Sequence, residues 1–283
     1  SIKIDRFINR FTFYIKAKSI NKKYSFDLTH FVTFTTINAY DIFKNSAHLI
    51  SVYTGFEKTQ KIIINHTLFQ KTIHKAHYDC LSPLIADLLK KSTSLDDDHI
   101  HTTPGSFIDL SNTDNNIDNK ENSIVFLGRL RDQKGLDLLL SLIANWRSIK
   151  PGYTFHIFGK GKAKKRIKTL IKNNNLSDKI HLSYTKNPKY HLRKSKIFLS
   201  LQKGENYPSQ SLLEAMACKN AVVATDVGLT HKLVDDSNGI RINNNTESLE
   251  NDNSLFESSR KKILDNHSVE QFHEYLSAIY NKI

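Results

Sequence analysis

Short apolar runs alternate with helical segments throughout the second half of the chain. Six of the runs are expected to be strands, at residues 124–127, 154–158, 179–182, 197–201, 221–224 and 239–242. The segments between almost every pair have the apolar spacing of amphipathic helices, and residues 246–283 are expected to add one or two closing helices. This alternation predicts a doubly wound parallel sheet, whose ligands bind outside the carboxyl ends of the strands.

The first half has a looser form of the same pattern. Strands are expected at residues 26–34, 49–53, 77–81 and 99–103. Helical spacing covers residues 1–24, which have a basic face, and residues 57–76. A third helix is expected to begin at Ser82-Pro83 and to continue to residue 91, because Pro is favoured in the first turn. These alternations fit a βαβ half-domain.

A polar stretch divides the two halves. Residues 111–122 contain five Asn and two Asp, which is typical of an interdomain linker or an exposed loop. A chain of 283 residues that is 39% hydrophobic can bury two modest cores. We therefore expect an α/β protein with one domain at residues 1–110, a linker at 111–122 and a second domain at 123–283.

Composition indicates the cellular compartment in which the protein is expected to work. Cys80 and Cys218 lie in apolar surroundings far apart in the sequence, which favours a reducing compartment without a disulfide framework. No apolar run is long enough to predict a transmembrane helix, and the charges along residues 1–20 argue against a signal peptide. The chain begins with Ser1 rather than Met, so its natural start is expected to lie upstream.

The net charge is +13 and is unevenly distributed. Residues 1–122 carry 15 Lys and Arg against 13 Asp and Glu, whereas residues 123–283 carry 26 against 15. A basic excess suits nucleic acid, an anionic membrane or phosphate-rich ligands. A bias in genome composition explains it equally well, since Asn, Lys and Ile are abundant along the whole chain.

The most informative stretch follows the apolar run at 197–201. Residues 205–217 read Glu-Asn-Tyr-Pro-Ser-Gln-Ser-Leu-Leu-Glu-Ala-Met-Ala, a polar turn followed by strong helix formers. The first N–H groups of a helix have no internal partner and lie at the positive end of its dipole. Ser209, Gln210 and Ser211 are therefore expected to bind an anion such as a diphosphate. Glu214 can accept hydrogen bonds from sugar hydroxyls, although an isolated glutamate there would be an ordinary exposed helix residue.

A second candidate site follows the first strand of the second half. Gly128 allows the backbone to approach a ligand, Arg129 offers a fork of donors to phosphate oxygens, and Lys134 adds a mobile charge. Both cations are expected to face the same crevice as the helix start at Ser209. Arg131 is expected to be solvated, and for each cation alone an ordinary surface position is the alternative.

These two segments resemble the signature of the retaining GT-B glycosyltransferases, family 4 in particular. In that family two glutamates separated by seven residues flank the donor sugar, whereas eight residues separate Glu205 from Glu214. The resemblance implies that Glu205 approaches the transferred sugar, that Glu214 binds the ribose, and that Arg129 and Lys134 hold the donor diphosphate. It also implies two Rossmann-like domains and catalysis by electrostatic stabilisation of the departing diphosphate, with no cofactor and no metal.

Two further loops are expected at the same edge. Residues 154–158 run into Gly159-Lys160-Gly161, and residues 179–182 run into Tyr184-Thr185, whose backbone the resemblance places against the nucleobase. A basic helix between them contains Lys160, Lys162, Lys164, Lys165, Arg166, Lys168 and Lys172. Such a run is more often a solvated face than a membrane-docking face, and both interpretations stay open.

The resemblance is strong over residues 123–245 and weak over residues 25–110. GT-B enzymes begin with a strand and a Gly-rich loop, and this chain is expected to enter its first domain after them. The N-terminal domain is therefore expected to be incomplete, with weak or absent transfer activity unless upstream residues are restored. The acceptor-side histidine common in the family is also missing, and His30 is interpreted as a strand-end histidine rather than a catalytic group.

Other chemistry finds little support in the sequence. Asp96-Asp97-Asp98-His99 contains the D-x-D of metal-dependent GT-A transferases, but it lies in a polar stretch without the matching sheet. No Cys/His spacing suggests zinc, and no G-x-S-x-G elbow suggests a hydrolase. Gly159-Lys160-Gly161-Lys162 lacks the spacing of a Walker A segment.

The expected function is transfer of a hexose, with retention, from a UDP- or GDP-type nucleotide sugar to a bacterial surface glycan or its lipid-linked precursor. The expected location is the cytoplasm, with peripheral contact at the inner face of the membrane and no nucleic acid partner. Two alternatives belong to other classes. One is an inactive remnant that only binds nucleotide sugar, and the other is a basic module that binds membrane or nucleic acid.

Overall fold

The structure is a computed structural model that describes residues 2–32, 40–52, 70, 73–103, 107–111, 113, 119–145, 152–242 and 254–282. The chain forms two compact units. One comprises Ser1–Gly105 together with His273–Ile283, and the other comprises Ser106–Phe272. These limits differ from the ranges 1–110 and 123–283 expected from the sequence, because the end of the last helix packs with the first unit and residues 106–122 belong to the second.

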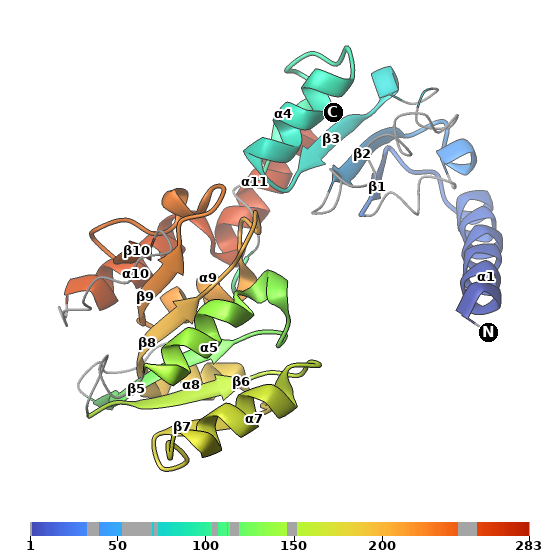
Figure 1. Cartoon of the computed structure of the whole chain (residues 1–283). Coiled ribbons are helices and arrows are strands. Elements are labelled where there is room, and N and C mark those ends of the chain that lie inside the picture. Colours follow the sequence, from blue (N-terminus) through green and yellow to red (C-terminus); the bar gives the residue numbers. More distant parts are fainter. Residues whose placement is uncertain are drawn as a thin grey trace. The chain divides into compact units, whose positions relative to one another are not determined.

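The second unit is built on a six-stranded parallel sheet (Figure 1). Its strands are β5 (Glu121–Leu127), β6 (Thr154–Phe158), β7 (Ile180–Ser183), β8 (Ser195–Ser200), β9 (Ala221–Thr225) and β10 (Gly239–Ile242). Their order in the sheet is β10-β9-β8-β5-β6-β7, and every neighbouring pair is parallel. Because the order reverses direction at β5, the unit is a doubly wound Rossmann-type fold, and the predicted fold class is confirmed.

Helices cover both faces of this sheet. They are η4 (Asp132–Lys134), α5 (Leu136–Ala144), α7 (Lys164–Asn173), α8 (Pro188–Lys194), α9 (Gln210–Ala217), η5 (Thr230–Lys232) and α10 (Ser254–Asn266). Helix α11 (Val269–Lys282) begins in this unit, but from His273 onward it belongs to the first. Helices α5 and α7 bury Leu139, Ile143 and Ile167 in one core on their side of the sheet. Helices α8, α9 and α10 contribute Leu192 and Leu213, among others, to a separate core on the opposite side. The sheet is therefore packed between two apolar layers, which fix the positions of its strand ends.

The stretch at residues 111–122 differs from the exposed linker that the sequence predicts. Glu121 and Asn122 already belong to β5. Lys120 is buried, and its ammonium group donates hydrogen bonds to the carbonyl oxygens of Leu192 at 3.1 Å and Ser195 at 2.7 Å. Thr113 is also buried. The other described residues of the stretch, Ser111, Asn119, Glu121 and Asn122, are exposed, so the difference from the prediction concerns Thr113, Lys120 and the start of β5.

The first unit contains a four-stranded parallel sheet in the order β1-β2-β3-β4. Its described elements are α1 (Ile2–Lys23), β1 (Leu28–Phe31), β2 (Ala47–Val52), η2 (Ile73–Lys75), β3 (His77–Cys80), α4 (Pro83–Ser92) and β4 (Ile100–Thr102). Helix α4 begins as predicted, because the Ser82 side chain accepts a hydrogen bond from the N–H of Ile85 and Pro83 follows it. The helix predicted at 57–76 lies almost wholly outside the described residues.

Helix α11 is fastened to the first sheet by a chain of hydrogen bonds. The Tyr275 hydroxyl donates to Asp79 Oδ1 at 2.6 Å, and the Ser51 hydroxyl donates to Asp79 Oδ2 at 3.1 Å. His30 Nε2 lies 2.7 Å from Ser51 Oγ, and His30 Nδ1 lies 2.9 Å from the Tyr280 hydroxyl. Burial raises the pKa of Asp79 and lowers that of His30. His30 therefore has a structural role on β1.

Neither cysteine forms a disulfide. Cys80 and Cys218 are free and buried in different units. Burial raises the pKa of the Cys80 thiol to about 12 and that of Cys218 to about 11, so both thiols are protonated near neutral pH. Within the described part of the chain, no helix combines the length and apolar character needed to span a bilayer.

Candidate functional site

The loops that follow β5, β6 and β7 are joined by backbone hydrogen bonds at the carboxyl edge of the second sheet. The N–H of Gly128 donates to the Phe158 carbonyl at 3.1 Å, and the N–H of Gly159 donates to the Ser183 carbonyl at 3.1 Å. The strand ends therefore present one continuous layer of backbone. Ligands of doubly wound sheets bind at this edge.

Lys134 projects from η4 toward the end of β8. Its ammonium group donates a hydrogen bond to the Gln202 side-chain carbonyl at 2.9 Å. Burial lowers the pKa of Lys134, and the nearby cations Arg129 and Arg131 lower it further. Two positive charges beside a half-buried ammonium are unfavourable without an anion, so the arrangement suits a negatively charged ligand.

Gly135 sets the position of this turn. Its φ of 69° lies in the left-handed region, and a Cβ atom there would overlap the Leu201 carbonyl oxygen. Only glycine therefore lets η4 pass so close to the end of β8 before α5 begins. Arg129 lies earlier in the same turn and is exposed, and its side chain forms no hydrogen bond or ion pair with the described residues. Its guanidinium group is available to a ligand.

The N-terminus of α9 points at the same edge. Ser209 is the N-cap residue and is buried, but its side chain makes no capping hydrogen bond. Its hydroxyl lies 3.4 Å from that of Ser211. The first N–H groups of a helix lack internal partners, so this end of α9 carries unpaired donors at the positive pole of the helix dipole.

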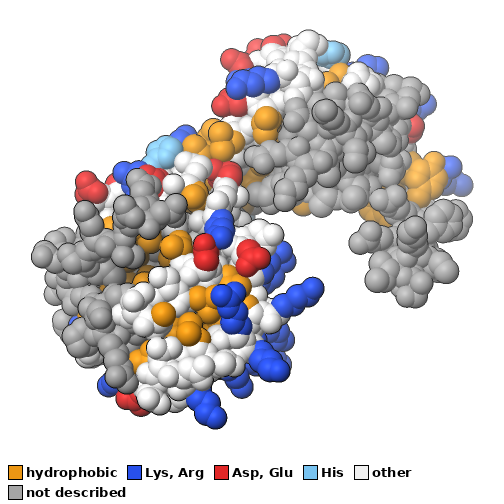
Figure 2. All heavy atoms as spheres, in the orientation of Figure 1, with side chains coloured by type: hydrophobic (Ala, Val, Ile, Leu, Met, Phe, Trp, Pro, Cys, Tyr) orange, Lys and Arg blue, Asp and Glu red, His pale blue; other side chains and the backbone are white. Residues whose placement is uncertain are grey.

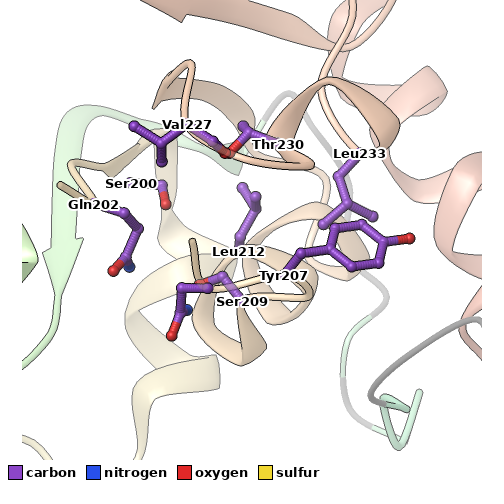
Figure 3. Close-up of a pocket in the computed structure, with 9 residues that line it drawn as sticks. Ser200, Gln202, Tyr207, Ser209, Leu212, Val227, Thr230 and Leu233 are labelled. Atoms are coloured by element: carbon purple, nitrogen blue, oxygen red, sulfur yellow. The ribbon is translucent and has the colours of Figure 1, made fainter. Parts of the chain in front are cut away.

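A small cavity lies beside this helix end (Figure 3). Its volume is about 10 Å³, and its lining includes Gln202, Tyr207, Ser209 and Leu212. Figure 3 shows Leu212 in the middle of the labelled residues, with Gln202 and Tyr207 on opposite sides. Such a volume holds about one water molecule and is far too small for a sugar. The cavity nevertheless places Gln202, the partner of Lys134, next to the N-cap of α9.

Glu205 is held by backbone groups on both sides. Its Oε1 accepts a hydrogen bond from the N–H of Tyr207 at 2.6 Å, and its Oε2 accepts one from the N–H of Leu229 at 2.8 Å. Gly228 has a φ of 54°, and a Cβ atom there would overlap the Glu205 carboxylate. The carboxylate thus connects two loops at the strand edge. It keeps further lone pairs for another donor, because a carboxylate can accept about four hydrogen bonds.

Glu214 lies on the first turns of α9 and is half-buried. Its Oε1 is 3.4 Å from the side-chain nitrogen of Gln210, a weak contact that leaves most of its acceptor capacity unused. Tyr184 and Thr185 follow β7. Lys160 Nζ lies 3.8 Å from the centre of the exposed Tyr184 ring, and Thr185 Oγ1 accepts a hydrogen bond from the Asn187 N–H at 3.0 Å.

The structure connects part of the predicted set only indirectly. Lys134, through Gln202, reaches the cavity beside Ser209, whereas Tyr184 contacts Lys160 of the neighbouring loop and Thr185 contacts Asn187 of its own loop. Sequence reasoning did not identify Gln202. The sequence feature that could have identified Gln202 is its position directly after the apolar run at 197–201, at the carboxyl end of a strand.

The carboxylates of the D-x-D segment are paired with side chains of the protein. Asp96 Oδ1 lies 2.6 Å from His99 Nδ1, Asp97 pairs with Lys90, and Asp98 pairs with Lys282 at 2.9 Å. Among the residues described by the structure, no group of three or more His, Cys, Asp or Glu is placed to hold a metal ion. These carboxylates therefore form surface ion pairs.

Comparison with known proteins agrees with this geometry. The sequence profile of the family "Glycosyl transferases group 1" matches residues 108–275, more than half of the chain. The chain is similar to a poly(ribitol-phosphate) alpha-N-acetylglucosaminyltransferase of Staphylococcus aureus (strain COL), with 29% identity over 145 residues. That match covers 50% of this chain and 29% of the relative.

A second relative is an N-acetylgalactosamine-N,N'-diacetylbacillosaminyl-diphospho-undecaprenol 4-alpha-N-acetylgalactosaminyltransferase of Campylobacter jejuni subsp. jejuni serotype O:2. It is 30% identical over 149 residues, which cover 52% of this chain and 38% of the relative. The matched parts thus span about a third of these two relatives.

A solved structure, HepE from Anabaena in complex with UDP-glucose, matches with a TM-score of 0.70 and 14% identity. It covers 94% of this chain and 82% of that one. At such low identity the match carries only the fold, which is GT-B with two Rossmann-like units.

Proposed function

The chain belongs to the glycosyl transferases group 1, and from that premise we propose that it transfers a hexose from a UDP-linked donor, with retention of configuration, to a phosphate-containing bacterial glycan or lipid-linked precursor. One observation carries the proposal. A half-buried lysine, an arginine whose side chain has no partner among the described residues, and the N-terminus of a helix all lie at the carboxyl edge of the second sheet, and each suits a diphosphate.

We assign the donor to the second unit. Arg129 and Lys134 bind the diphosphate oxygens, and the N–H groups of Gln210 and Ser211 complete the anion site. Glu214 accepts hydrogen bonds from the ribose hydroxyls, because its carboxylate makes only a weak contact with Gln210. The backbone beside Tyr184 and Thr185 borders the base.

Catalysis in this proposal is electrostatic. Negative charge grows on the departing diphosphate as the bond to the sugar breaks, and Arg129, Lys134 and the dipole of α9 stabilise that charge in place. Glu205 orients the sugar with the acceptor capacity left beyond its two backbone bonds. The site needs no metal for this task, since its cations come from the chain.

We assign the acceptor to the first unit and to an anionic substrate. The names of both sequence relatives contain a phosphate group, as poly(ribitol-phosphate) in one and diphospho-undecaprenol in the other. A lipid-linked acceptor would bring the protein to the inner surface of the cytoplasmic membrane.

A transfer assay with purified chain tests the proposal. UDP-glucose, UDP-N-acetylglucosamine, UDP-N-acetylgalactosamine and GDP-mannose are offered with undecaprenyl-diphosphate-linked sugar or poly(ribitol phosphate). Transfer from a UDP sugar to one of these acceptors, with an α-linked product by NMR coupling constants, is the expected result. Donor binding without transfer to either acceptor supports the alternative of an inactive binding remnant, and a β-linked product contradicts retention.

Glu205→Gln tests the sugar-orienting role. The variant keeps the shape but loses the charge, so kcat is expected to fall by about 10- to 100-fold while the KM for the donor changes little. Glu214→Gln is the matched comparison, because loss of the ribose contact should raise the KM more than it lowers kcat. An unchanged kcat in Glu205→Gln contradicts the role assigned to Glu205.

A further inference from the structure

Helices α5 and α7 border a groove on the second unit. Its volume is about 740 Å³. Its lining combines three apolar residues (Leu140, Ala144 and Leu170, here called the floor), three polar residues (Ser141, Thr169 and Asn173) and three cations (Lys162, Lys165 and Arg166, here called the rim). Figure 2 shows hydrophobic side chains on this unit with Lys and Arg gathered beside them. The groove therefore combines two features that a solvated helix face does not need together.

The side chains of the rim cations have no partner among the residues that the structure describes. Lys162, Lys165 and Arg166 are exposed, and none of their side chains forms an ion pair or hydrogen bond with those residues. The sequence also contains no Asp or Glu from Leu138 to Ser177, although nine Lys and Arg lie in that range. Neighbouring acidic groups therefore do not neutralise this surface, and its field acts on an external anion.

The helix that carries most of the charge is firmly anchored. Ile167 and Ile171 of α7 are buried in the core of the unit, so the basic side chains must point outward. An ordinary solvated face would account for the charges alone. The groove adds a recess beside these cations, and its lining includes Leu170, which is partly exposed, and Ala144, which is exposed.

We propose that the groove between α5 and α7 docks the protein onto an anionic phospholipid bilayer. Lys162, Lys165 and Arg166 bind the headgroup phosphates, and the apolar floor receives the first methylenes of an acyl chain. Nucleic acids and soluble polyanionic glycans would use the rim but not the floor, so the lipid surface matches both features. The inference rests on the proposed function in one respect, because a lipid-linked acceptor gives the protein a reason to contact a membrane.

Vesicle sedimentation tests the docking face. The wild type is expected to bind vesicles of phosphatidylcholine with phosphatidylglycerol and not vesicles of phosphatidylcholine alone. The triple variant Lys162→Gln, Lys165→Gln, Arg166→Gln should bind about 100-fold more weakly, since each basic residue near such a surface contributes about a factor of five. The control variant Lys44→Gln, Lys75→Gln, Lys91→Gln removes the same charge from exposed positions of the first unit and should bind like the wild type.

The floor has its own test. In about 1 M salt, where charges are screened beyond about 3 Å, the wild type should keep a residual affinity that the Ala144→Glu variant loses.

Equal binding of the triple variant and the wild type, equal binding to both kinds of vesicle, or no vesicle binding at all would each overturn the proposal. So would rim-dependent binding of duplex DNA or heparin without vesicle binding. Transfer to a detergent-dispersed acceptor is measured separately, so that failure of docking is distinguishable from failure of the proposed activity.

Discussion

Lys120 is a buried cation that holds the carbonyl groups at the end of α8. Asn220 donates hydrogen bonds to the same two carbonyl oxygens, of Leu192 at 3.0 Å and Ser195 at 2.6 Å. Burial lowers the pKa of Lys120 to about 7. In the unfolded chain the pKa returns to about 10.4, so between these values the unfolded state binds more protons than the folded state.

The free energy of unfolding is therefore expected to rise with pH above 7. Between pH 7 and pH 9 the contribution of Lys120 is about 2 kcal/mol, because each pH unit in this window is worth up to about 1.4 kcal/mol. Urea denaturation at the two pH values measures it, and Lys120→Met should remove the rise. Lys179→Met, at an exposed lysine, is the control. The same pH dependence in Lys120→Met and in the wild type would contradict the account.

Gly228 is the second residue whose change has a defined outcome. Ala at this position must adopt a left-handed backbone and must displace the Glu205 carboxylate. Gly228→Ala is expected to lower the free energy of unfolding by about 1 to 2 kcal/mol or more. Gly204→Ala is the matched control, because no atom lies within 4 Å of a Cβ built there. Equal stability of the two variants by urea denaturation would refute this view of Glu205.

The site residues were only partly predictable, for a physical reason. Arg129, Lys134 and Glu214 follow strands or begin a helix, so local pattern places them at the sheet edge. The contact between Lys134 and Gln202 joins residues 68 positions apart, and the contact between Glu205 and Leu229 joins residues 24 positions apart. Such partners depend on how separate loops pack, which no local pattern encodes.

At the scale of elements, α11 depends on one buried carboxylate. Tyr275→Phe removes the hydroxyl that donates to Asp79 and leaves that charged group with one hydrogen bond fewer. The free energy of unfolding is expected to fall by about 1 to 3 kcal/mol. Amide hydrogen exchange should quicken first in residues 269–282. Tyr14→Phe, at an exposed tyrosine of α1, should change neither quantity, and wild-type exchange in Tyr275→Phe would show that the bond does not hold α11.

The strands of both sheets were predicted within a few residues, because β-branched apolar runs between turns carry a strong local signal. The structure of the stretch at 111–122 was not predicted correctly. Its Asn and Asp content indicated a solvated linker, whereas Lys120 and Thr113 are buried and residues 121–122 begin a strand. Polar residues that find buried partners cannot be distinguished from solvated ones by composition.

At the scale of the whole molecule, the fold leads us to expect that the donor binds to the second unit and the acceptor to the first. The second unit contains a complete six-stranded sheet, both of its cores and every residue assigned to the diphosphate. Donor binding is therefore expected to depend on this unit, independently of how the acceptor is recognised.

Calorimetric titration with UDP tests that central claim most directly. The wild type should bind UDP, and the double variant Arg129→Ala, Lys134→Ala should bind at least about 100-fold more weakly, because two hydrogen bonds from charged groups are lost. Lys179→Ala, at an exposed lysine directly before β7 and therefore at the opposite edge of the sheet, should keep nearly wild-type affinity. Absence of UDP binding in the wild type, or equal affinity in the wild type and the double variant, would contradict the account.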